Sequence, residues 1–178
     1  YGKYKAIDPT TLNPEQQHAR ALALRNFVLS GAELTGQAKQ RFAAIQERQA
    51  EISQLFSEHV LDATDAWSLT VGKEDTAGIP DDVLQAAHAA AQAYCNEGYK
   101  LTLKMPCYLP VMQYAHSSGL RERLYRAYAT RASDQSEQPE FDNGPVLKEI
   151  LQLRREEAQL LGYTNHAQVS LASTMAPS

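Results

Sequence analysis

One long amphipathic stretch limits the folds open to this chain. Apolar residues recur at steps of three, four and seven between positions 42 and 60, which is the spacing of one helix face. Thr35 can cap this helix, and the pattern extends to about Ala63, so we predict roughly thirty helical residues. Such a length suggests a hairpin with the preceding helix or a wall that spans a domain. The predicted buried face consists of Phe42, Ile45, Ile52, Phe56 and Val60.

Capping and stop signals predict helices on either side of this one. Asn13 is a good N-cap, and Pro14 an ideal first residue, for a helix that ends near Ser30, before Gly31. Further helices are expected at about 80–96, at 110–116, at 119–132 with Ser118 as its cap, and from 165 onward.

The stretch NGPVLKEILQLRREEAQLLGY predicts another well-marked helix. Asn143 can accept hydrogen bonds from the first turn, where Pro145 is tolerated, and Gly162 allows a left-handed exit. The stretch contains no nucleophile, histidine or cysteine, so we interpret it as scaffold. Its predicted core face consists of Leu147, Ile150, Leu151, Ala158 and Leu161.

Two segments alternate between apolar and polar residues in the manner of β-strands. Trp67, Leu69 and Val71 form the first pattern, and residues 99–105 form the second. We expect the strands 67–71 and 99–105 to pair, bridged by the alanine-rich helix between them. The predicted fold class is therefore mainly α, a helical lobe with a small two-stranded β element.

The composition is that of a soluble globular protein. Hydrophobic residues make up 43% of the 178 positions, and the net charge of −4 provides no basic field for nucleic acid or anionic lipid. No apolar run approaches the ~20 residues of a membrane helix, and the first residues do not show the charged-then-apolar pattern of a leader peptide. Two cysteines do not make a disulfide framework, which favours a reducing, cytoplasmic setting. The start at Tyr1 and the stop at Ser178 suggest a piece of a longer protein.

No self-contained catalytic motif is present. The sequence lacks His-Glu-x-x-His, Cys-x-x-Cys, Gly-x-Ser-x-Gly and a Gly-rich phosphate loop. His59 and Asp62, or Glu58 and Asp62, could share a helix face and hold a metal, although a solvated helix end is the simpler interpretation. Cys107 lies between two prolines; no activating partner is recognised near it in sequence, so structural packing is favoured over a reactive thiol. We therefore predict no catalytic, cofactor-binding or metal-binding residue within the chain.

Two groups of side chains could contact a ligand. A basic run on one helix could bind a phosphate or a peptide carboxylate, or could be a solvated face paired with Glu122 and Asp134. Dense tyrosines could contact peptides, or could lie at the edges of the core. The basic run is Arg121, Arg123, Arg126 and Arg131, and the tyrosines are Tyr94, Tyr99, Tyr108, Tyr114, Tyr125, Tyr128 and Tyr163.

A series of segments runs through FVLSGAEL (27–34), FSEHVLDAT with the following Trp (56–67), LTLKMPCYLPVMQYA (101–115), LRERLYRAYATRASDQ (120–135) and FDNGPVLKEILQLRREEAQLLGYTNHAQVSLASTMA (141–176). In order and without large gaps, this series resembles the M3 family of zinc oligopeptidases, the thimet oligopeptidase family. The resemblance covers essentially the whole chain and corresponds to the N-terminal half of the family.

The resemblance implies a mostly helical protein with two lobes around a narrow channel that admits short unstructured peptides. It also implies a zinc ion held by a His-Glu-x-x-His helix and a downstream glutamate, with the motif glutamate activating a water. That zinc helix lies beyond the matched region, so no family site residue has a counterpart in residues 1–178. Residues 1–178 are accordingly expected to be a partial N-terminal, channel-wall domain without the catalytic zinc domain. The face that lines the channel is not identified.

Three hypotheses of different class follow. In the first, the chain is a scaffold fragment of a zinc oligopeptidase, binds no zinc itself and is inactive alone; its parent uses zinc and acts on short peptides. In the alternative, the chain is a stand-alone, non-enzymatic helical module that binds peptides or proteins. An enzyme that uses Cys107 is a third reading. Neither nucleic acid nor membrane is an expected partner, and apolar faces bared by truncation could cause self-association.

Overall fold

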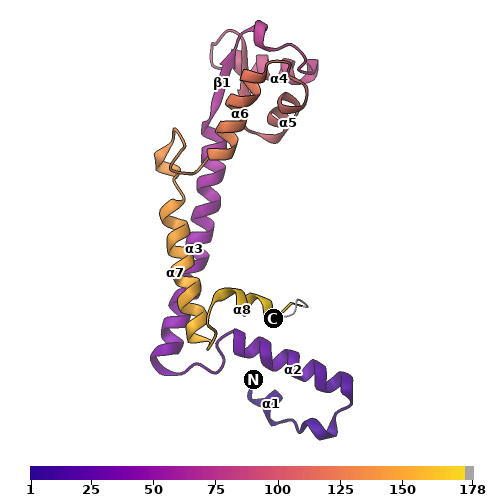
Figure 1. Cartoon of the computed structure of the whole chain (residues 1–178), viewed down its shortest axis with the longest axis vertical. Coiled ribbons are helices and arrows are strands. Elements are labelled where there is room, and N and C mark those ends of the chain that lie inside the picture. The colour runs from indigo at the N-terminus through magenta and orange to yellow at the C-terminus, as the bar shows by residue number, and fades with distance from the viewer. Residues whose placement is uncertain (175–178) are drawn as a thin grey trace. The chain divides into compact units, whose positions relative to one another are not determined.

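The computed structural model describes residues 1–174, whose helices and strands are labelled in Figure 1. It divides the chain into two compact units. The terminal unit comprises Tyr1–Ser53 and the described residues from Leu147 onward, and the central unit comprises Gln54–Val146. Within residues 1–174, no helix combines the length and the hydropathy needed to cross a membrane.

Helices make up the terminal unit. They are α1 (Gly2–Ala6), α2 (Pro14–Leu29), the first part of α3 (Gly36–Ala66), most of α7 (Gly144–Leu160) and α8 (His166–Leu171), with a short 3-10 helix, η1, at Pro9–Thr11. At the start of α2, the predicted cap is confirmed as a reciprocal pair. The Asn13 side chain accepts from the Gln16 backbone N–H at 2.8 Å, and the Gln16 side chain accepts from the Asn13 N–H at 3.1 Å.

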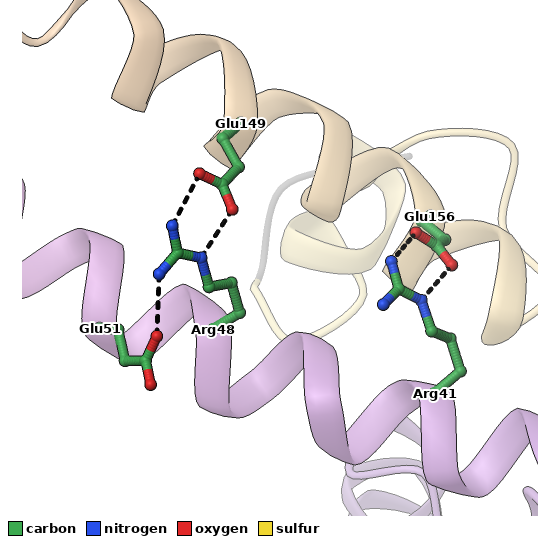
Figure 2. A network of polar contacts seen from close by, with 5 residues as sticks. All are labelled: Arg41, Arg48, Glu51, Glu149 and Glu156. Atoms are coloured by element: carbon green, nitrogen blue, oxygen red, sulfur yellow. Dashed lines mark hydrogen bonds and ion pairs between the residues drawn. The ribbon is translucent and has the colours of Figure 1, made fainter.

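In this unit, α3 packs against α7. Phe42, Ile45 and Ile52 of α3 are buried, as predicted, and so are Leu153 and Ala158 of α7. Arg41 binds Glu156, whereas Arg48, one heptad later in α3, binds Glu149, one heptad earlier in α7 (Figure 2). The two helices therefore run antiparallel.

The buried face of α7 differs from the predicted one. Leu147 and Leu151 were expected in the core, but 48% of Leu147 and 65% of Leu151 are exposed. Val146 and Leu153 are buried instead, and Ile150 is half-buried. The prediction assumed that every apolar residue of α7 faces inward. In the structure, α3 packs against one face of α7, and the glutamates of α7 that bind the arginines of α3 flank that face.

The central unit has the predicted two-stranded element. Strand β1 (Ser68–Val71) pairs antiparallel with β2 (Tyr99–Thr102), with Leu69 opposite Leu101. Figure 1 shows α4, α5 and α6 gathered near β1. These helices are α4 (Asp81–Gln92), α5 (Met105–Tyr114) and α6 (Ser118–Thr130), and two 3-10 helices are η2 (Lys73–Asp75) and η3 (Pro139–Phe141). A contiguous core joins the two strands with α4, α5 and α6. It consists of Val71, Ile79, Ala87, Leu101, Leu103, Tyr108, Val111, Ala115, Leu120 and Leu124.

Some predicted boundaries were wrong. The second strand ends at Thr102 rather than 105, and α5 begins at Met105 rather than 110. The prolines were read as strand and helix breaks, but Pro106 occupies the first turn, where a missing N–H costs nothing, and Pro110 is accommodated inside the helix. The first strand begins at Ser68 rather than 67, and α4 ends at Gln92 rather than 96. The hydroxyl of Ser117, not Ser118, caps α6 by accepting from the Leu120 N–H at 3.2 Å.

Candidate functional site

His59 is part of a buried polar link in the central unit. Its Nδ1 lies 3.0 Å from Oδ1 of Asn143, and its ring lies 6.2 Å from the Phe141 ring. The Asn143 side chain is almost fully buried and donates through Nδ2 to the Phe56 carbonyl at 3.1 Å. With the amide in this orientation, Nδ1 of His59 is the donor to Oδ1. A solvated helix end was the favoured interpretation of this face, with a metal site as the alternative; the structure instead pairs His59 with Asn143. In the part of the chain that the structure describes, no three His, Cys, Asp or Glu residues are grouped to hold a metal ion.

The predicted role of Asn143 as a helix cap was wrong. At the start of α7, the Gly144 N–H is bound by the carboxylate of Asp142 at 2.8 Å. Asn143 instead ties this corner to α3, and its own backbone N–H donates to the Ala132 carbonyl at 3.1 Å. Asp142, one position earlier, thus accepts from a free N–H at the start of α7. The side-chain amide of Asn143 pairs instead with the Phe56 carbonyl and with His59.

Cys107 has a structural environment. Its side chain is half-buried in the first turns of α5, and its Sγ accepts from the Thr102 N–H at 3.4 Å. The sulfur therefore receives the backbone donor at the end of β2. The other cysteine, Cys95, is exposed at a left-handed position with φ of 57°. These surroundings agree with the packing interpretation of Cys107.

The six tyrosines of the central unit lie in different environments. Tyr108 is buried and stacks on Tyr128 with ring centroids 4.2 Å apart, and burial raises the pKa of its hydroxyl. Tyr99 packs near His88, with ring centroids 5.7 Å apart. Three others in the central unit are exposed: Tyr94, Tyr114 and Tyr125. These six tyrosines therefore divide between core edges and solvent-exposed positions.

The structure brings three of the four arginines together. Arg123, Arg126 and Arg131 line one cavity of about 250 Å³ in the central unit. Arg121 is not among its lining residues; its guanidinium donates to the carbonyls of Ala115 and His116. The predicted pairing of the run with Glu122 and Asp134 does not occur in residues 1–174.

A ladder of charged pairs in the terminal unit was not predicted. Arg48 donates to both carboxylate oxygens of Glu149, at 2.7 and 3.0 Å, and to Glu51 at 2.9 Å, as Figure 2 shows. Arg41 donates to both oxygens of Glu156, each at 2.7 Å. These hydrogen bonds hold the pKa values of Glu149 and Glu156 below their ordinary value. Heptad spacing of arginines in α3 and of glutamates in α7 was the available signal.

Comparisons with known proteins point to one family. Residues 111–178 match the family model described as "Peptidase family M3". The chain is 49% identical over 168 residues to oligopeptidase A of Salmonella typhimurium and likewise to oligopeptidase A of Escherichia coli, which covers 93% of this chain and 25% of each relative. It is 45% identical to oligopeptidase A of Haemophilus influenzae over 90% of the chain and 24% of that protein. The chain thus spans about a quarter of the length of these relatives.

Proposed function

Because this chain belongs to peptidase family M3, we propose that it is part of a zinc-dependent oligopeptidase that hydrolyses short unstructured peptides. Within that protein the chain supplies scaffold and channel wall rather than reacting groups. The observation that carries this proposal is the 49% identity to oligopeptidase A, which extends over 93% of the chain.

The surroundings of the candidate residues support a scaffold role. His59 is committed to Asn143, and Cys107 accepts a backbone hydrogen bond. No His-Glu-x-x-His motif occurs in the sequence, and residues 1–174 contain no cluster of ligands suited to zinc. The present residues therefore do not fit the metal, and we assign the zinc of the parent protein to a part of it outside this chain. The chain alone is accordingly expected to be inactive.

A hydrolysis assay tests this proposal. The 178-residue chain and the longest protein encoded by its gene are each incubated with a short peptide, with zinc and with a chelator. We expect cleavage by the longer protein only, and its loss on chelation, because the motif that generates a nucleophile from water is absent from this chain.

Three results would contradict the proposal. Cleavage by the chain alone would refute its inactivity, and loss of that cleavage in Cys107→Ala would support a thiol enzyme. A reading frame that ends at Ser178 would favour the stand-alone binding module. A longer frame without His-Glu-x-x-His would remove zinc hydrolysis from the proposal.

A further inference from the structure

The arginine-lined cavity of the central unit is lined by both cationic and apolar side chains. Arg123, Arg126 and Arg131 come from α6 and its C-terminal end. Trp67 and Leu103 line the same cavity of about 250 Å³. Leu103 belongs to the core, and half-buried Trp67 packs against that core, so these two side chains are held in place. A ligand that contacts both kinds of side chain needs an anionic group and an apolar group.

The cations of this cavity lack acidic partners. Arg123 and Arg126 are exposed, and neither forms an ion pair within residues 1–174. Glu137 is the single acidic residue that lines the cavity, so positive charge is in excess there. Guanidinium groups bind carboxylates and phosphates through paired N–H donors. The unpaired charge therefore favours an anionic ligand.

Contacts within the chain fix the orientation of the Arg131 guanidinium. Its guanidinium carbon lies 3.7 Å from the centre of the Tyr128 ring, which in turn stacks on Tyr108. One of its N–H groups donates to the Tyr128 carbonyl, whereas its Nε is buried without a hydrogen-bond partner in the described chain. A stacked guanidinium loses little freedom on binding, and a buried donor without an acceptor is costly. The ring stacking and the backbone hydrogen bond therefore fix the orientation of the Arg131 guanidinium at the cavity.

We propose that this cavity binds the C-terminal carboxylate of a peptide whose last side chain is apolar. The carboxylate lies against Arg126 and Arg131, and the side chain lies against Trp67 and Leu103. The volume suits one terminal residue rather than a drug-sized molecule. Inorganic phosphate would engage the arginines but make no contact with the apolar residues that line the cavity. This inference rests on the proposed function in taking a peptide as the source of the carboxylate.

The chain contains its own reporter of binding, because Trp67 is its only tryptophan. The 178-residue chain, without zinc, is titrated with acetyl-Ala-Leu bearing a free carboxylate, with the same peptide as its C-terminal amide, and with inorganic phosphate. We expect a saturable change in Trp67 emission with the free acid, and affinity at least about ten-fold weaker for the amide, which lacks the charge that guanidinium groups bind.

Two variants locate the site. Arg126→Gln removes one cavity cation and should weaken binding of the free acid about five-fold. Lys73→Gln removes the same charge from an exposed position outside the cavity and should leave binding unchanged. Equal urea midpoints of Arg126→Gln and the unmodified chain establish that the variant folds; if the midpoints differ, Arg126→Lys, which keeps the charge, must restore binding.

The proposal fails if the free acid gives no saturable change, if the amide binds equally well, or if Lys73→Gln weakens binding as much as Arg126→Gln. Phosphate that saturates the signal as tightly as the peptide would make this a phosphate site and overturn the peptide assignment. Binding is measured without hydrolysis. Absence of peptide binding would therefore not change the result of the zinc-dependent cleavage assay. Absence of cleavage would likewise not change the binding measured by Trp67 emission.

Discussion

The central and terminal units are stabilised by different means. The central unit has a contiguous core to which both strands and α4, α5 and α6 contribute. In the terminal unit, α1, α2 and α8 contain no buried residue, and burial is concentrated where α3 meets α7. Charged pairs and amide contacts from α3 to α7 flank that narrow seam. The difference indicates that the central unit depends mainly on apolar packing, and the terminal unit more on exposed polar contacts.

The largest expected effect tests the packed core of the central unit. Leu124 is fully buried among core residues, so Leu124→Ala should lower the free energy of unfolding by about 2–5 kcal/mol through lost burial and a residual cavity. Urea unfolding monitored by Trp67 emission measures this. A loss below about 1 kcal/mol would mean that the core collapses around the change, and that the contrast between the units is smaller than the structure indicates.

A second comparison sets a buried amide against an exposed one. Asn143→Ala should cost about 1–3 kcal/mol, because it leaves the Phe56 carbonyl and His59 without their partner inside the central unit. Asn165→Ala, the matched control, removes only the exposed cap of α8 and should cost about 1 kcal/mol or less. Urea unfolding of both variants provides the measurement, and equal losses would contradict the structural role of Asn143.

The charged seam of the terminal unit predicts a dependence on pH. Hydrogen bonds from arginine lower the folded-state pKa of Glu149 and Glu156. Their stabilisation is therefore complete above the unfolded pKa of about 4.3 and is lost as the pH falls through the folded pKa. Melting temperatures measured between pH 6 and pH 3 should fall, and less so in Arg41→Gln/Arg48→Gln. If the double variant keeps the pH profile of the unmodified chain, the charged pairs between α3 and α7 do not cause the pH dependence of the melting temperature. The effect should be smaller than that of Leu124→Ala, because the pairs are half-exposed.

The smallest effect on stability is expected at the exposed leucines of α7. Leu151→Ala should change the free energy of unfolding by no more than about 0.5 kcal/mol, although the sequence pattern placed Leu151 in the core. If the chain associates with itself through this surface, Leu147→Lys/Leu151→Lys should shift sedimentation velocity toward the monomer without unfolding. If Leu151→Ala lowers the free energy of unfolding by several kcal/mol, Leu151 is buried as the sequence pattern predicted.

Local patterns predicted the helices and strands well where one short-range signal dominated. The cap at Asn13, the apolar face of α3 and the pairing of residues near 67–71 and 99–105 were all found. The region around 105–110 was misjudged because proline is compatible with a first helical turn as well as with a strand end. The buried side of α7 was misjudged because its sequence offers apolar residues on more than one side.

The sequence also predicted some features of the candidate site and not others. The sequence identified the basic run, the absence of a catalytic motif and the family resemblance. It could not separate Arg121 from the other three arginines, because that separation depends on which residues of the loop 133–138 and of β1 meet α6. Nor could it place Trp67 in the same cavity as these arginines, since Trp67 and Arg126 are distant in sequence.

The sequence by itself determined the helical class, the two-stranded element and the membership in peptidase family M3, because these depend on local periodicity and on the order of residues along the chain. Only the tertiary structure decided which face of α7 is buried, that Asn143 binds α3 rather than capping its own helix, and that three arginines share a cavity with Trp67. Each of these depends on which partner occupies the space beside a residue. That choice is settled by packing and by the pairing of buried polar groups across segments far apart in the chain.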